Sequence, residues 1–166
     1  MRGRRPARIV TAAAVALAAL ASVAALLFVE RAGVTLRVTH VERGRVVWSR
    51  HVPTGQRFEL RYTHSVERTP VVEEYRAEPD GVWFELMRFY SQGAGLPTEG
   101  YVREGKAFVL RARRKVGVLS VRVSSIAKHE MMIGDERIDL IALARDGAAL
   151  AIESRPAPWR LRRVRP

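Results

Sequence analysis

The spacing of short β-type segments limits the fold of this chain more than any other feature. From Val34 onward, runs rich in Val, Ile, Phe, Tyr and Trp are separated by Gly, Pro and Asp turn signals at short intervals. These intervals leave no room for the long helical crossovers that a parallel sheet requires. The sequence therefore predicts an all-β domain, mainly antiparallel, folded as a sandwich or a flattened barrel.

About nine strands follow from this pattern, with one short helix or loop expected between Ser125 and Met132. The β domain then spans residues 34–153, and a basic tail, residues 154–166, follows it. The expected strands are Val34 to Val41, Arg45 to His51, Arg57 to Val66, Val71 to Ala77, Val82 to Tyr90, Ala107 to Arg113, Leu119 to Ser125, Ile138 to Ala144 and Ala148 to Glu153.

A long apolar segment precedes the β domain. Residues 9–29 consist almost entirely of Ala, Val, Leu, Ile and Phe, and a helix of this length crosses a bilayer core. The basic residues 1–8 before it hold the N-terminus in the cytoplasm by the positive-inside rule, so we expect the β domain to face the periplasm. The segment is either a retained anchor in the inner membrane or a signal peptide cleaved near Ala19-Leu20-Ala21, which would leave the domain secreted to the periplasm.

Charge and cysteine content exclude several function classes. The formal net charge is +12, but four arginines lie in the first eight residues and five lie after Glu153. Positive and negative charges are therefore nearly balanced in residues 9–153. No aromatic-basic interleaving or groove-reading helix accompanies this charge, and we therefore expect no nucleic-acid partner. The absence of cysteine removes thiolate nucleophiles and cysteine-type zinc sites.

A predicted hairpin carries the most chemical information. In residues 58–66, alternation puts Tyr62 and His64 on the apolar face, and Glu73 and Tyr75 share one face of the next strand. Pairing Val66 with Val71 around a four-residue turn would set His64 opposite Glu73 and Tyr62 opposite Tyr75. An imidazole and a carboxylate meeting there form a satisfied structural pair, the polar floor of a ligand pocket, or a catalytic or metal-binding group.

The neighbouring polar residues narrow these alternatives. Ser65 lies next to His64 on a strand and points to the opposite face, so the two cannot act as nucleophile and base. Glu67 is three residues from His64, which is a poor spacing for metal ligands on a strand. No metal or other cofactor is expected.

A glycine-containing loop, residues 91–97, follows the strong strand that ends at Tyr90. Gly93 and Gly95 permit close backbone approach, so N–H groups beside Ser91 can cradle a carboxylate or phosphate. A tight connection that ends in Pro97 explains the same residues. The loop is neither a P-loop nor a dinucleotide-binding fingerprint.

The hairpin and the loop together resemble a known family. The run from Tyr62 to Glu67, then Thr69-Pro70-Val71 with Glu73 and Tyr75, and Ser91 with Gly93-Ala94-Gly95-Leu96-Pro97, are similar to the motifs of the exported proteins grouped as domain of unknown function 1850. The resemblance covers roughly Val34 to Ile152. Members are often encoded beside tripartite ATP-independent periplasmic (TRAP) transporters of the TAXI type.

This resemblance implies an extracytoplasmic accessory or small-ligand-binding protein of such a transporter, and not an enzyme. Partners would be the substrate-binding protein or the permease, and a small acidic solute. The ligand-binding residues expected from the motifs are His64, Ser65, Glu67, Glu73, Tyr75, Ser91, Gly93 and Gly95. Two alternatives stay open: a small hydrolase or isomerase that uses His64 and Glu73 as acid and base, and a structural protein of the cell envelope that binds an anionic surface through its basic tail.

Overall fold

The structure is a computed structural model that describes residues 15–22 and 33–157. It forms two units, Met1–Ala32 and Gly33–Pro166, each of which is described by itself. In the first unit residues 15–22 form a helix with exposed side chains. Within the described ranges, no helix has the length and apolar character needed to span a bilayer. The rest of segment 9–29 lies outside the described residues, so its role as anchor or signal peptide stays a prediction.

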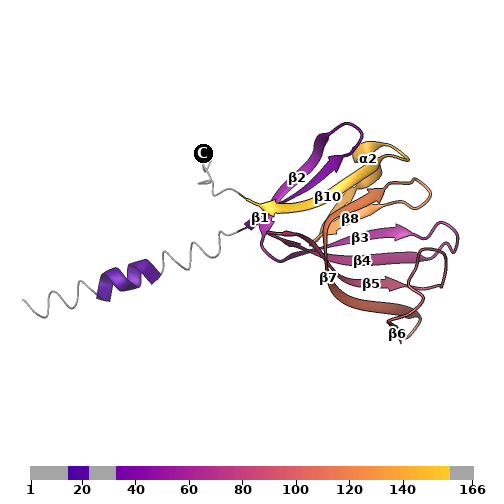
Figure 1. The fold of residues 1–166 in the computed structure, drawn as a ribbon, viewed down its shortest axis with the longest axis horizontal. Coiled ribbons are helices and arrows are strands. Elements are labelled where there is room, and N and C mark those ends of the chain that lie inside the picture. The colour runs from indigo at the N-terminus through magenta and orange to yellow at the C-terminus, as the bar shows by residue number, and fades with distance from the viewer. Residues whose placement is uncertain (1–14, 23–32, 158–166) are drawn as a thin grey trace, which may run out of the picture. The chain divides into compact units, whose positions relative to one another are not determined.

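The second unit is built almost entirely from strands, joined by tight turns (Figure 1). Their bounds are β1 (Gly33–His40), β2 (Arg45–Pro53), β3 (Gln56–Thr63), β4 (Pro70–Glu78), β5 (Gly81–Phe89), β6 (Tyr101–Glu104), β7 (Ala107–Arg122), β8 (Glu130–Ile133), β9 (Glu136–Asp139) and β10 (Ala149–Pro156), with one short helix, α2 (Leu140–Ala144), between β9 and β10.

All the strand pairs are antiparallel and belong to one sheet in the order β2-β1-β10-β7-β5-β4-β3-β8-β9, with β6 added beside β7. The predicted all-β, mainly antiparallel class is confirmed. The sheet is a single curled half-barrel, so its two halves face each other without being separate sheets. Figure 1 shows β1, β2 and β10 forming one half and β3, β4 and β5 the other.

Strand β7 joins the two halves. Its first part pairs with β5, and its last part, from Val118 to Arg122, pairs with β10. Between the two parts lies Gly117, whose φ of +76° suits glycine and bends the strand. Gly81 packs directly on this bend, because a Cβ on Gly81 would lie only 2.8 Å from the Gly117 Cα. The sheet can therefore fold over on itself without a break in the ladder.

The core lies between the two halves and follows the alternation of the strands. In β1, Val34, Leu36 and Val38 are buried while the residues between them are not, and β4 shows the same period with Val71, Glu73, Tyr75 and Ala77. Opposite them, Phe58 of β3 is buried against Tyr75, with ring centroids 5.5 Å apart. Burial of an aromatic or aliphatic side chain of this size stabilises the fold by about 1.5–3 kcal/mol.

Several predicted elements differ from the observed ones. The two strands expected within residues 107–125 are one strand, β7, because Gly117 bends the chain without ending the pairing. β6 and β8 were not predicted, since each has only four residues. Segment 138–144 was predicted as a strand but divides into the end of β9 and helix α2. Asp139 ends the strand because its carboxylate accepts hydrogen bonds from the N–H groups of Ile141 and Ala142 and caps the helix.

β10 also runs farther than expected. It continues through Ser154 and Arg155 to Pro156, which lies opposite Val34 of β1. Regular structure therefore extends beyond Glu153, where the basic tail was expected to begin.

Candidate functional site: two loops joined through a histidine

The β3–β4 hairpin differs from its predicted register. Thr63 pairs with Pro70, Tyr62 with Val71 and Leu60 with Glu73, so the predicted pairings of Val66 with Val71, His64 with Glu73 and Tyr62 with Tyr75 are wrong. The strand stops at Thr63 because residues 64–69 form a turn of their own. The His64 N–H donates to the Thr69 carbonyl at 2.8 Å, and the Arg68 N–H donates to the His64 carbonyl at 2.9 Å.

His64 itself lies at the centre of a compact contact. Its side chain is buried, with 8% exposure for the residue. Nδ1 accepts a hydrogen bond from the Glu67 N–H at 3.1 Å, and Nε2 lies 3.0 Å from the Ala94 carbonyl oxygen. Because Nδ1 accepts and a carbonyl can only accept, these contacts assign the proton to Nε2. Both ring nitrogens are thus occupied by main-chain groups.

Gly93 packs against this ring. A Cβ at position 93 would lie 2.9 Å from Glu67 Cγ and 3.0 Å from His64 Cε1, so only glycine fits without a shift of its neighbours. The loop then turns, with the Leu96 N–H donating to the Gly93 carbonyl at 3.1 Å and Gly95 at a φ of +86°. Leu96 anchors the loop by packing into a small apolar cluster with Val71 and Phe89.

A second link joins the two segments. Thr69 Oγ1 and Ser91 Oγ lie 2.7 Å apart. Of the predicted site residues, His64, Glu67, Ser91 and Gly93 therefore come together, and Gly95 lies on the same loop. Ser65 is exposed and takes no part in these contacts.

Glu73 and Tyr75 belong to a different place, the interior of the sheet. The Tyr62 hydroxyl donates to one oxygen of the Glu73 carboxyl group at 3.0 Å, and the Tyr75 hydroxyl donates to the other at 2.5 Å. Burial, with the neighbouring Glu73 carboxyl group second, raises the pKa of both phenols above its ordinary value of 10.0. These hydrogen bonds satisfy both oxygens of a carboxyl group that is almost fully buried.

The acid/base pair on which the hydrolase or isomerase hypothesis rested is therefore not formed. His64 is bound by two loops and Glu73 by two tyrosines. Tyr62 is the member of this cluster that the sequence analysis did not select. The alternation pattern places Tyr62 on the same face as His64, and this was the available signal. The predicted register paired Tyr62 with Tyr75, so the contact between Tyr62 and Glu73 was missed.

His129 lies beside the cluster formed by Tyr62, Glu73 and Tyr75. Its ring stacks on Tyr62 with centroids 5.3 Å apart, and its Nδ1 accepts a hydrogen bond from the Ser124 N–H at 3.1 Å. Burial lowers the pKa of His129 below its ordinary value of 6.5. The 124–129 turn is tied to β3 as well, because the Thr63 N–H donates to the Ala127 carbonyl at 2.7 Å.

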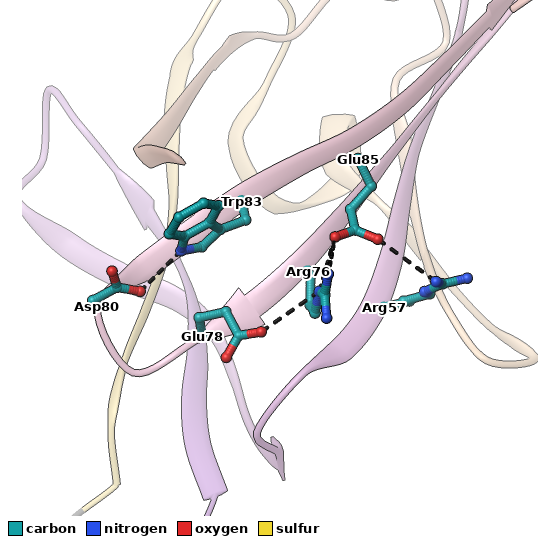
Figure 2. A network of polar contacts seen from close by, with 6 residues as sticks. All are labelled: Arg57, Arg76, Glu78, Asp80, Trp83 and Glu85. Atoms are coloured by element: carbon teal, nitrogen blue, oxygen red, sulfur yellow. Dashed lines mark hydrogen bonds and ion pairs between the residues drawn. The ribbon is translucent and has the colours of Figure 1, made fainter. Parts of the chain in front are cut away.

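The outer face of the sheet carries a separate network of charged side chains (Figure 2). Arg76 of β4 donates to Glu85 of β5 through both Nε and Nη2, and it also lies 3.5 Å from Glu78. Arg57 approaches the second oxygen of Glu85 at 3.6 Å. These ion pairs tie β3, β4 and β5 together on the solvent side.

Within residues 15–22 and 33–157, no three His, Asp or Glu side chains are grouped closely enough to hold an ion. Two hollows in the surface lie along β2 and β3, and neither includes His64, Glu67, Gly93 or Ala94.

Fold and site together define a small antiparallel β domain in which one histidine joins two loops. Residues 58–140, half of the chain, match the family described as domain of unknown function (DUF1850), and the chain belongs to that family. No curated protein and no solved structure matches the chain.

Proposed function

We propose that this protein is an exported, non-catalytic accessory domain of a TRAP-type solute transporter of the TAXI class, held at the inner membrane through residues 9–29 and facing the periplasm. Its working surface is the loop platform, defined as residues 64–69 together with 90–97. The observation that carries the proposal is the engagement of both His64 ring nitrogens by main-chain groups of these loops. A histidine held in this way fixes a surface and has no free nitrogen for proton transfer.

The exposed side chains of the loop platform favour a protein partner. Val66 is 70% exposed at the tip of the turn and Tyr90 is 42% exposed at the start of the second loop. Glu67 and Arg68 flank them as exposed charges. Apolar and aromatic groups surrounded by charged ones are typical of protein interfaces, and the transporter's substrate-binding protein or permease is the partner that the family resemblance suggests.

A binding measurement tests this proposal. Purified protein is titrated with the substrate-binding protein of a TAXI-type transporter and, in nanodiscs, with the permease of the same transporter. Val66→Asp should weaken binding by about tenfold or more, because it places a charge in the centre of the platform. Val118→Asp is the matched control, since Val118 is also exposed but lies on β7. Equal binding by both variants, or binding to neither transporter component, contradicts the proposal.

The proposed accessory role has a second form, in which the loop platform binds a small acidic solute directly and not a transporter protein. The Arg68 guanidinium and the N–H groups of the glycine loop are the groups on the platform that can attract an anion. A thermal-shift screen with organic acids and amino acids separates the two forms. A shift in melting temperature that Arg68→Gln removes favours a solute, and unchanged melting together with transporter binding favours the protein partner.

A further inference from the structure

The two edges of the curled sheet approach each other at one place. β2 and β9 are the end strands of the sheet, and Arg50 of β2 forms an ion pair with Glu136 of β9. Beside this pair lies a hollow of about 410 Å³, which we call the seam. One wall is the end of β2, from Arg50 to Pro53, and the other is the β8–β9 turn with Gly134, Asp135 and Glu136.

The hydrogen-bond pattern of β1 shows which backbone groups of β2 are free. The Val41 N–H donates to Ala149, and the Ala157 N–H donates to Gly33, so the odd-numbered residues of β1 bond to β10. In an antiparallel ladder the alternate residues bond to the other neighbour, so the even-numbered residues of β1 bond to β2. Their partners are Val52, Arg50 and Trp48.

The residues between these partners, Ser49 and His51, consequently direct their N–H and C=O groups away from β1. Pro53 has the same parity, which agrees with its lack of an N–H. The His51 ring leans back over β1, because a Cβ on Gly33 would lie 2.5 Å from His51 Nε2. The ring therefore does not cover the backbone groups of its own residue.

The walls of the seam carry opposite charges. On the β2 side Arg50 is 47% exposed at its side chain, and on the turn side Glu136 is equally exposed with Asp135 next to it. A ligand that pairs with the free groups of Ser49 and His51 must present an extended peptide backbone. Arg50 and Glu136 pair with each other in this structure, so a ligand that matches both walls exchanges that ion pair for contacts with its own carboxylate and ammonium group.

We propose that the seam binds a short peptide with free termini, which adds to β2 as an extra antiparallel strand. Its backbone pairs with His51 inside the hollow and with Ser49, the strand position next to Arg50. Its carboxylate takes the place of Glu136 at Arg50, and its ammonium group binds the carboxylate of Asp135 or of the released Glu136. The volume of the seam lies within the range of about 300–1,000 Å³ that is usual for small-ligand sites. This site is separate from the loop platform and does not rest on the function proposed above.

The test is an NMR titration of the ¹⁵N-labelled full chain with the tripeptide Val-Ala-Val. We expect the amide signals of Ser49 and His51 to shift and to gain protection from exchange. Ser49→Pro should abolish binding, because it removes the free N–H, while it leaves the β1–β2 ladder intact. Ser49→Ala keeps that N–H and should bind as the wild type does.

Two further binding measurements test whether the charged residues of the seam bind the termini of the peptide. Arg50→Gln should weaken binding by about tenfold, while Arg45→Gln, at the far end of the same strand, should leave it unchanged. The same tripeptide with acetyl and amide caps should bind about tenfold more weakly than the free form. Equal binding of the capped peptide would assign the site to an internal segment of a polypeptide and overturn the proposal. Absence of shifts at Ser49 and His51 with either peptide at concentrations of about 5 mM would overturn it as well.

Discussion

His64 Nε2 donates a hydrogen bond to the Ala94 carbonyl oxygen, 3.0 Å away, across two loops that are separated by strands β4 and β5. With the bond that Nδ1 accepts from Glu67, this ring forms the main polar link between the two motifs.

Replacement of His64 by Gln should lower the free energy of unfolding by about 1–2 kcal/mol, since one flexible amide cannot reproduce both hydrogen bonds of the ring. Chemical denaturation measures the change. His51→Gln is the matched control, because His51 is exposed on an edge strand, and it should change the stability by no more than about 0.5 kcal/mol. Equal losses in the two variants would show that the link contributes nothing.

Gly93→Ala should destabilise the domain by about 1–3 kcal/mol, because the added methyl group meets Glu67 Cγ and His64 Cε1 at about 3 Å. Removal of one neighbour should relieve part of this cost. In a double-mutant cycle, the effect of Gly93→Ala should therefore be smaller in a Glu67→Ala background. Additive effects in the cycle would place the strain elsewhere.

A pH dependence follows from His129. Since burial lowers its pKa below 6.5 in the folded chain, the unfolded chain binds a proton first as the pH falls. The free energy of unfolding should therefore decrease as the pH drops below about 6.5. His129→Gln should remove this component of the slope, and His51→Gln should retain it. Denaturation curves at pH 7.5 and pH 5.5, at about 0.15 M salt, make the comparison.

A second pH dependence of stability, in the alkaline range, follows from the two buried tyrosines. The pKa values of Tyr62 and Tyr75 are raised in the folded chain, so the unfolded chain loses its phenolic protons first as the pH rises through 10.0. The stability they provide is present below that pH and is lost above it. The double variant Tyr62→Phe/Tyr75→Phe should flatten this loss, whereas Tyr90→Phe, at an exposed position, should not. Unfolding at pH 9 and pH 11, followed by circular dichroism, distinguishes them.

Glu85 is the shared acceptor of the outer network in Figure 2. Its side chain is 14% exposed, so its ion pairs are partly shielded from water. Glu85→Gln should cost about 1–2 kcal/mol of stability, as expected for a charge-assisted, two-pronged contact. Glu104→Gln breaks the far more exposed pair with Arg111 and should cost less than about 1 kcal/mol. A smaller loss for Glu85 than for Glu104 would contradict the network's role.

The alternation of residues was sufficient to predict which side chains face the core, but not where β3 ends. Phe58 and Leu60 are buried as expected, and the observed register differs from the predicted one by four residues, an even number that leaves every face unchanged. The pattern continues through His64 to Val66 in the sequence. The strand nevertheless stops, because the His64 ring binds the Glu67 N–H and closes a turn, which no periodicity can reveal.

The meeting of the two loops was likewise beyond sequence reasoning. Gly93 suited both an anion cradle and a tight connection, and only the position of the His64 ring shows why a side chain is excluded there. Helix α2 was missed because Leu140 to Ala144 continue an apolar run. Its start depends on the capping carboxylate of Asp139, a local contact that the preceding strand pattern concealed.

The long strand β7 has one more consequence. Because its first part completes one half of the domain and its last part completes the other, a cut near Gly117 would leave each fragment with an unpaired ladder. The two halves are therefore not modules that evolution or engineering can exchange separately, and any graft onto this scaffold must carry β7 whole.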